Sequence, residues 1–420
     1  MAGEGLASAM SNAVPSGWRL SRRFLVWRAL RNARIQLNAS MLRDGAEALA
    51  IAERHARNAI FLAADAGRPR LKIEAMLTLA IVYDRKAERE NGLCYLNQSM
   101  KLTREALAQD DCDGRLRARL LGSLGTALVR RAERTGEMSA LDESIVVQRS
   151  ALALLDRRQD RARRAVLLAG LGTALVRLAE RDGTEATARE AVALLSEALA
   201  TCRRGRTPLR WASIRNTLST AQARLAQRTA DAELLETAAA GLRAALAERR
   251  RETTPIGWAA TATDLGHVLA SLGDLRSSEP LLQQALIQFR EALAEVPLET
   301  SPRDFAEVQM NIAAVLQRLA ARSDDPAALE AALGAIDAAQ SGVTRADCPL
   351  DWAMAELGRA ATLAALARLR HRPELFENAL RSIADALVVL SPLSAVGPID
   401  RAERLKYEIE QEMISTGGRS

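Results

Sequence analysis

Side chains that could bind an anion recur along this sequence at a fixed spacing of 47 residues. One column is basic in four of five successive positions: Arg130, Arg177, Arg224, Ser271 and Arg318. A second column holds hydroxyl groups and an imidazole: Thr126, Thr173, Thr220 and His267. A guanidinium group forms paired hydrogen bonds with a carboxylate. A row of arginines with Asn216 beside it therefore suits an acidic peptide or a free C-terminus.

The same arginines also have an interpretation that needs no ligand. Glu133 follows Arg130 by three residues, and Glu180 follows Arg177 by three residues. On a helix this spacing brings the two side chains together, with a gain of about 0.2–0.5 kcal/mol per pair. Exposed pairs of this kind contribute little and imply no partner. The sequence leaves open whether the column is a binding site or a solvated row of ion pairs.

No combination of residues predicts catalysis or metal binding. None of the three histidines has metal-ligand spacing to another candidate ligand: His55, His267 and His371. The four cysteines form no C-x-x-C pair: Cys94, Cys112, Cys202 and Cys348. The sequence has neither a phosphate-binding glycine loop nor a G-x-S-x-G motif. We therefore expect no enzyme activity, no catalytic residue, no metal and no cofactor, and thiols kept reduced in the cytoplasm.

The positive charge of the chain is concentrated near its start. The formal net charge is +6, and residues 1–70 account for this excess, while the remainder is balanced. The balanced remainder argues against a nucleic-acid partner. Within 18–34, arginines alternate with apolar residues at helical spacing, which predicts a basic amphipathic helix. Residues that could contact an anionic membrane surface are Arg19, Arg22, Arg23, Trp27 and Arg31.

The alternative for this helix is a structural one. It would be the first helix of a helical array, with the stripe of Leu20, Phe24, Trp27 and Leu30 packed on the next helix and its arginines in water. The sequence does not exclude either interpretation.

Internal repetition determines the predicted fold. The run LGTALVR occurs at 124–130 and again at 171–177. The same shift aligns six copies, with alanine at one phase throughout: Ala118, Ala165, Ala212, Ala259, Ala306 and Ala353. Alanine also fills a second phase: Ala151, Ala198, Ala245, Ala292, Ala339 and Ala386. Helices can approach closely only where side chains are small, so these columns predict helix crossings. Since 48% of residues are apolar and no run reaches 18, we expect no transmembrane helix.

Each repeat is predicted to contain two helices. Four first helices start with a Pro, and the residues directly before it are Thr207, Thr254, Ser301 and Cys348. We expect the three hydroxyl side chains to cap their helices, whereas Cys348 is a poor cap. Two earlier repeats place Asp113 and Asp160 at this position. An aromatic residue follows each Pro by three positions: Trp211, Trp258, Phe305 and Trp352. We interpret these rings as packing anchors between repeats, with a ligand-stacking cage as the alternative.

The helix pairs resemble tetratricopeptide repeats (TPRs). The resemblance depends on a Leu-Gly step in the first helix, at 124–125, 171–172 and 265–266, and on a small residue in the second helix: Ala191, Ala238, Ala285 and Ala379. A usual TPR has about 34 residues. The 47-residue unit is closer to the long-helix TPR arrays of bacteria and fungi. The resemblance covers about 70–397 and implies an all-α, right-handed α-solenoid of stacked antiparallel helix pairs.

The expected organisation and function follow from this resemblance. We expect a disordered segment at 1–16, a basic helix pair at 17–66, a degenerate repeat at 67–112, six repeats at 113–397, and a capping helix with a tail at 398–420. The leading hypothesis is a non-catalytic scaffold that holds a protein or peptide in its concave groove. The alternatives are a regulatory sensor that responds to a peptide or small ligand, and a membrane-surface adaptor that uses the basic helix. The sequence does not indicate an oligomeric state.

Overall fold

The computed structural model describes residues 16–40, 45–90, 92–182, 184–393 and 395–417, and these residues form helices and short connections without a strand. The first five helices are α2 (Ser16–Ala39), α3 (Gly45–Asp65), α4 (Pro69–Glu90), α5 (Leu93–Leu107) and α6 (Gly114–Thr135). The next six are α7 (Met138–Ala153), α8 (Arg161–Asp182), α9 (Glu185–Thr201), α10 (Pro208–Thr229), α11 (Ala232–Leu246) and α12 (Pro255–Leu275). The last six are α13 (Glu279–Leu293), α14 (Pro302–Ser323), α15 (Pro326–Gly342), α16 (Pro349–Arg370), α17 (Glu374–Leu390) and α18 (Val396–Gly417). The predicted disordered segment at 1–16 lies outside the described residues except for its last position.

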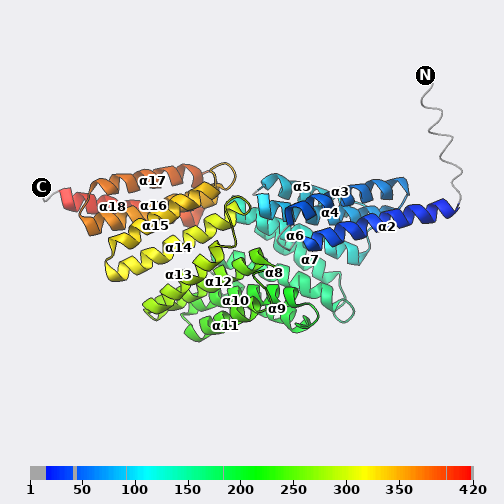
Figure 1. Cartoon of the computed structure of the whole chain (residues 1–420), viewed down its shortest axis with the longest axis horizontal. Helices are drawn as coiled ribbons and strands as arrows, with labels where there is room; N and C mark the ends of the chain where they lie inside the picture. The colour runs from blue at the N-terminus through cyan, green and yellow to red at the C-terminus, as the bar shows by residue number, and fades with distance from the viewer. Residues whose placement is uncertain (1–15, 41–44, 91, 183, 394, 418–420) are drawn as a thin grey trace, which may run out of the picture.

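The helices are stacked as antiparallel pairs in chain order, which confirms the all-α solenoid (Figure 1). The helices α6, α8, α10, α12, α14 and α16 each begin 47 residues after the previous one. Each of them packs mainly on the helix that follows it and on the neighbouring pair. The sequence period is therefore the period of the fold.

The small-residue columns lie at the helix crossings, as predicted. All twelve alanines of the two aligned columns are buried, with at most 3% of their surface exposed. At Gly172 an added Cβ would come within 2.6 Å of Leu195 on the paired helix, and at Gly266 within 2.6 Å of Phe289. A glycine in one helix thus makes room for a large side chain in its partner, which lets the pair pack closely.

The predicted hydroxyl caps were wrong for the Pro-initiated helices. Thr207, Thr254 and Ser301 precede the proline, but none of their side chains accepts a hydrogen bond from the helix. The Thr254 hydroxyl instead donates to the carbonyl of Arg250 at 3.1 Å, in the preceding turn. Asp113 does cap its helix, accepting from the amide of Leu116 at 2.8 Å. Proline fixes the first turn without a side-chain acceptor, so the hydroxyl is free to bond to the loop.

Three of the four aromatic anchors, the tryptophans, lie under arginines from the preceding loop. The guanidinium of Arg204 lies 4.8 Å from the ring centre of Trp211, and that of Arg251 lies 5.0 Å from that of Trp258. Trp258 also packs against the central hydrophobic core. This arrangement agrees with the packing interpretation of these rings.

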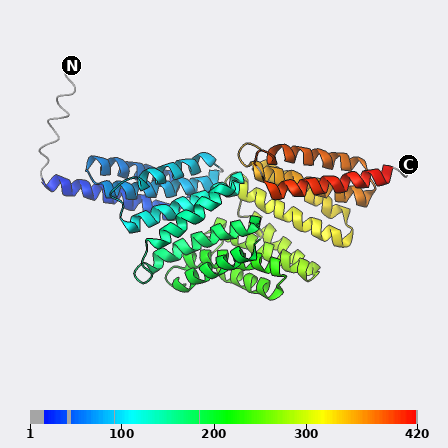
Figure 2. The ribbon, with the colours of Figure 1, turned by 180° about the vertical axis from the view of Figure 1, so that it is seen from behind.

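The solenoid curves until its two halves touch. In both views α6 meets the start of α14 near the middle of the molecule, while α8 to α13 form the bend between them (Figures 1 and 2). The contact is confirmed by a hydrogen bond from Arg303 Nη2 to the carbonyl of Glu133 at 3.4 Å, between residues 170 positions apart. α6 also contacts α16. The concave side is therefore closed by the protein itself at this point. None of the helices in the described ranges has the length and apolarity needed to span a membrane.

Candidate functional site

The closed concave side contains two adjoining cavities. One has a volume of about 500 Å³ and the other of about 600 Å³. Most of their lining residues lie on the first helices of the pairs, from α4 to α16. Four residues line both cavities: Glu133, Arg177, Arg303 and Glu307. Volumes of this size are typical of pockets for small molecules. The site is thus a pair of partly open cavities on the concave side, where the sequence predicted a concave groove.

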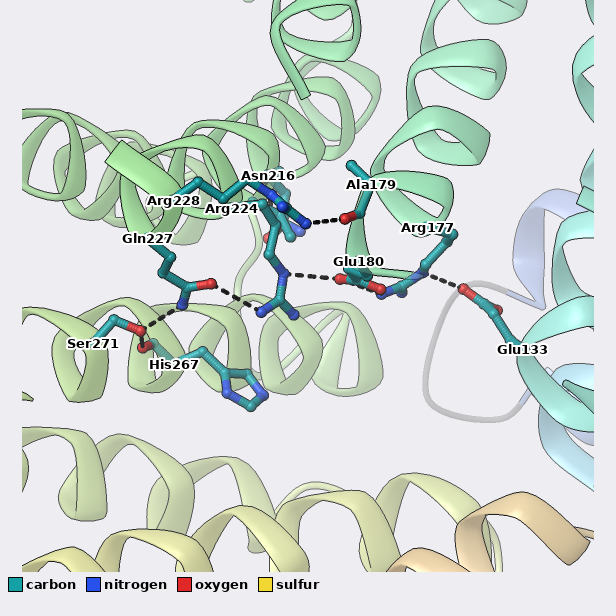
Figure 3. A network of polar contacts seen from close by, with 11 residues as sticks. Glu133, Arg177, Ala179, Glu180, Asn216, Arg224, Gln227, Arg228, His267 and Ser271 are labelled. Atoms are coloured by element: carbon teal, nitrogen blue, oxygen red, sulfur yellow. Dashed lines mark hydrogen bonds and ion pairs between the residues drawn. The ribbon is translucent and has the colours of Figure 1, made fainter. Parts of the chain in front are cut away.

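Each arginine of the predicted column is already paired with a carboxylate from the preceding repeat (Figure 3). Arg177 Nε lies 2.5 Å from Glu133 Oε1, and its Nη1 lies 3.2 Å from Glu180 Oε2. Arg224 Nε then lies 2.8 Å from Glu180 Oε1. The column is therefore a chain of ion pairs that joins successive repeats. Of the two predicted pairs three residues apart, Arg177–Glu180 forms. Glu133 instead pairs with Arg177 of the next repeat, and Arg130 pairs with Glu88.

The arginines at the two ends of the column are also paired with acidic residues of the preceding helix pair. Arg130 bonds to Glu88 and donates to the carbonyl of Asp84 at 3.3 Å. Arg318 Nη1 lies 3.1 Å from Asp274 Oδ2.

In one repeat two uncharged side chains occupy the positions of the ion pair. The arginine position is Ser271 there, and the preceding carboxylate position is Gln227. Gln227 Nε2 donates to Ser271 Oγ at 2.6 Å (Figure 3). A neutral hydrogen bond thus replaces the ion pair at the same place in the stack. This substitution on both sides indicates that the column holds repeats together.

The threonine column makes local contacts. The hydroxyls of Thr126, Thr173 and Thr220 each donate to the carbonyl four residues earlier in their own helices. His267 differs, because it lines the second cavity and packs edge-on against Phe289 with ring centres 5.3 Å apart. Burial, and then the positive charges of Arg224, Arg318 and Arg177, lower the pKa of His267 to about 3. It is therefore a neutral imidazole at physiological pH.

Asn216 binds a carboxylate of the protein itself, whereas the sequence suggested that it would bind the carboxylate of a ligand. Its side-chain amide donates to Asp264 on α12, the next first helix, and its own carbonyl oxygen is buried without a hydrogen-bond partner. Burial raises the pKa of Asp264.

Three acidic residues of the first cavity were not among the residues predicted from the sequence, although their pKa values are raised. Asp304 and Glu307 lie one turn apart on α14 and line the first cavity with Asp264. Burial, partly offset by Arg303, raises the pKa of Asp304 to about 6 and that of Glu307 to about 7. Glu307 keeps exposed surface and lines both cavities. One signal was present, because Asp264 is the one charged residue in its column: Ser123, Gly170, Thr217, Asp264, Asn311 and Gly358.

Two arginines of the first cavity have no carboxylate partner among the described residues. Arg134 has 2% of its surface exposed and donates to the carbonyl of Ala87, while its Nε and Nη1 have no partner. Arg249 donates to the carbonyl of Gly257 at 2.8 Å and to the hydroxyl of Thr261. Burial lowers the pKa of both guanidinium groups from their ordinary value. The cavity therefore holds uncompensated groups of both charges.

The basic N-terminal helix packs through a stripe different from the one expected for a structural helix. Val26, Ala29, Leu30 and Ala33 are buried, whereas Phe24 is 58% exposed and Trp27 is 50% exposed. The helix packs closely on the following helices through its small alanines, and both rings lie on its exposed side.

The predicted membrane-contact residues are distributed around these rings. Arg22 forms an ion pair with Asp65 at 2.9 Å, Arg23 is exposed, and Arg31 lies over the Trp27 ring at 5.4 Å. The side chain of Arg19 lies outside the part of the chain whose side chains the structure describes.

Across the described ranges, no group of three histidine, cysteine or acidic side chains is arranged to hold a metal ion. All four cysteines are free thiols.

Comparison with known proteins adds evidence on the fold. No protein-family model and no curated protein sequence matches the chain. Among solved structures, a Rap protein complexed with competence and sporulation factor superposes with a TM-score of 0.55 at 13% identity, over 96% of this chain and 99% of that one. The apo form of RapI gives 0.40 at 13% identity over 93% and 99%, and the human IFIT1 dimer with PPP-AAAA gives 0.43 at 14% identity over 88% and 86%. The chain is a TPR-like helical solenoid.

The likeness to the Rap complex extends over nearly the whole of both chains, so the fold assignment is not confined to a few repeats. At this level of identity the comparison shows the solenoid fold alone. What the TPR-like solenoid does must be argued from its own cavity.

Proposed function

We propose that this TPR-like solenoid is a non-catalytic receptor that binds a short peptide, or an extended segment of a protein, inside its concave cavity. The observation that carries this proposal is the closure of the concave side by Arg303 and Glu133 around cavities of about 500 and 600 Å³. A globular partner does not fit such a space, whereas a ligand of a few residues does. The Rap structure of the same fold was solved in complex with a factor, which supports ligand binding by this architecture.

The test uses the full chain and a cavity-filling variant. Ala260 lines the first cavity and is accessible from it, so Ala260→Trp should fill the space without disturbing the buried helix crossings. The purified protein is mixed with a low-molecular-weight peptide fraction, separated by gel filtration, and its bound peptides are counted by mass spectrometry. Wild type should retain peptides that Ala260→Trp loses.

Val146→Trp provides the matched control, because Val146 is 63% exposed and does not line either cavity. Equal retention by wild type and Ala260→Trp, or no retention by wild type, would contradict the proposal.

The closure contact also supports the sensor alternative. Arg303 bridges the two halves of the solenoid, bonding to Glu133 on α6 and to Asp351 on α16 at 2.9 Å. A ligand held between the halves would stabilise the closed form, since binding can shift an equilibrium between two forms that it contacts differently. Small-angle scattering with and without bound peptide tests this: a smaller radius of gyration with peptide supports a sensor, and an unchanged radius contradicts it.

A separate observation favours a second candidate function, attachment to an anionic membrane surface. Phe24 and Trp27 lie with their ring centres 6.2 Å apart on the exposed side of α2, next to Arg23 and Arg31. Exposed aromatic rings beside basic residues suit the interface of an anionic bilayer. We expect flotation with vesicles that contain phosphatidylserine and loss of flotation in Phe24→Ser/Trp27→Ser. Equal flotation of the variant and wild type would exclude this role.

A further inference from the structure

Among the described residues, the charged side chains that line the first cavity are not all paired. Both acidic and basic groups remain without a partner of opposite charge. Most cavity arginines are paired with carboxylates: Arg85 and Arg130 with Glu88, Arg177 with Glu133 and Glu180, and Arg303 with Asp351. Once these pairs are removed, Asp304 and Glu307 have no basic partner within ion-pair distance among the described residues. Asp264 has only the amide of Asn216. Asp304 is half-buried and Glu307 keeps exposed surface, and both line the cavity, so a ligand inside it can reach both carboxylates. A ligand that carries a cation would give these carboxylates the charged partner that the protein does not supply.

A second, independent observation comes from the opposite charge. Arg134 is almost completely buried, yet two of its three guanidinium nitrogens have no hydrogen-bond partner. A buried donor without a hydrogen-bond partner destabilises the folded protein, and more so when it is charged. Arg134 lines the same cavity as Asp304, and the residues that precede them in the chain, Glu133 and Arg303, are joined by a hydrogen bond of 3.4 Å. The two unsatisfied groups are therefore neighbours.

We propose that the cavity recognises the C-terminus of a short peptide whose last residue is basic. The cation of that side chain would lie between Asp304 and Glu307, and the terminal carboxylate would accept hydrogen bonds from Arg134. A C-terminal lysine or arginine carries both charges on one residue, which matches unsatisfied groups of both signs that lie close together. This inference rests on the proposed function. It also differs from the acidic peptide expected from the sequence, because the arginines of that column are already paired.

The test uses pools of pentapeptides that are acetylated at the N-terminus and randomised at four positions. The last residue is lysine, norleucine or glutamate, and each pool is made both as the free acid and as the amide. Peptides retained by the full chain are measured by mass spectrometry. We expect the lysine free-acid pool to be enriched at least tenfold over the norleucine acid and over the lysine amide, since one charge-assisted hydrogen bond is worth about that factor.

Near-isosteric variants assign the two parts of the site. Asp304→Asn/Glu307→Gln should lose the preference for lysine over norleucine, and Arg134→Met should lose the preference for acid over amide. Glu377→Gln is the control, because Glu377 is exposed on α17 outside both cavities. Thermal melting of each variant shows whether the fold is intact, and should Arg134→Met fail to fold, Arg134→Lys replaces it.

The outcomes separate this inference from the proposed function. Retention of all pools alike, or preference for norleucine or glutamate, would overturn the basic C-terminus while leaving a peptide receptor in place. Retention of no pool would contradict both. Loss of binding in Glu377→Gln would show that the variants act through the fold.

Discussion

Replacing Arg177 tests whether the inter-repeat ion pairs hold the solenoid together. Arg177→Met removes the cation that contacts Glu133 on α6 and Glu180 on its own helix, but keeps an apolar stem of similar length. From the sequence alone, alanine at Arg177 and Arg224 would reduce partner binding and leave the melting temperature nearly unchanged. The contacts in the structure lead to a different expectation.

The magnitude follows from how far the pair is removed from water. Breaking a fully buried ion pair costs about 3–5 kcal/mol, and breaking an exposed one costs about 0–1 kcal/mol. The side chains of Glu133 and Glu180 are 24% and 23% exposed, and that of Arg177 is 39% exposed. Burial opposes the charge of Glu133, and Arg177 is the first of the groups that lower its pKa below the ordinary value. Discounted for this exposure, the loss should be about 2 kcal/mol.

Urea denaturation followed by circular dichroism measures this loss. Arg104→Met is the matched control, because Arg104 contacts Glu143 in the neighbouring pair at 2.7 Å with both side chains more exposed, 52% and 42%. Its midpoint should move much less. In the double variant Arg177→Met/Glu133→Gln, part of the stability should return, since the carboxylate left without a cation is removed as well. If Arg177→Met and Arg104→Met shift the midpoint equally, the column is a solvated row and the reasoning is wrong.

Three further predictions address single positions. Glu307→Gln should raise the free energy of unfolding at pH 8 by about 1 kcal/mol, because the pKa of Glu307 is about 7 in the folded protein and near 4.5 in the unfolded chain. In denaturation at several pH values this gain should disappear as pH falls from 7 to 4.5, and a gain that does not depend on pH would contradict the raised pKa. Ala245→Leu should lower stability by about 1–3 kcal/mol in thermal melts, since Ala245 is fully buried at a helix crossing; an unchanged melt would show that the crossing has spare room. Ala230→Gly should raise stability by about 1 kcal/mol, because Ala230 has a left-handed φ of 52°, and a loss in urea denaturation would mean that the alanine side chain contributes more than this strain costs.

Most of the fold was predictable from the sequence, and the reason lies in the repeat. Every unit must bury its helices against neighbours of the same architecture, so a small residue is needed at each crossing, as at Ala118 and Ala165. Those requirements are local and appear as columns 47 residues apart. The hydroxyl caps failed, because the choice between bonding to the helix and bonding to the loop at Thr254 depends on the loop conformation.

The site was only partly predictable. The sequence identified the column of Arg177 and Arg224 but not its partners, since Glu133 reaches Arg177 from another repeat. Asp304 and Glu307 were missed because neither belongs to a repeating column of acidic residues. Arg134 does recur, as Arg181, Arg228 and Arg322, but the sequence does not show that the nitrogens of Arg134 are left without partners. For the N-terminal helix, periodicity predicted an amphipathic element but not its rotation, which leaves Phe24 and Trp27 exposed.

The amino-acid sequence by itself determined that the chain is a stack of helix pairs with a 47-residue period, because packing between neighbouring units is a short-range property repeated along the chain. Only the tertiary structure decided that the stack curves far enough to bring Arg303 against Glu133, 170 residues away. Small rotations between successive helix pairs add up to this curvature, so the closure cannot be predicted from any single unit. The cavity and its unpaired charges exist only as a result of this sum.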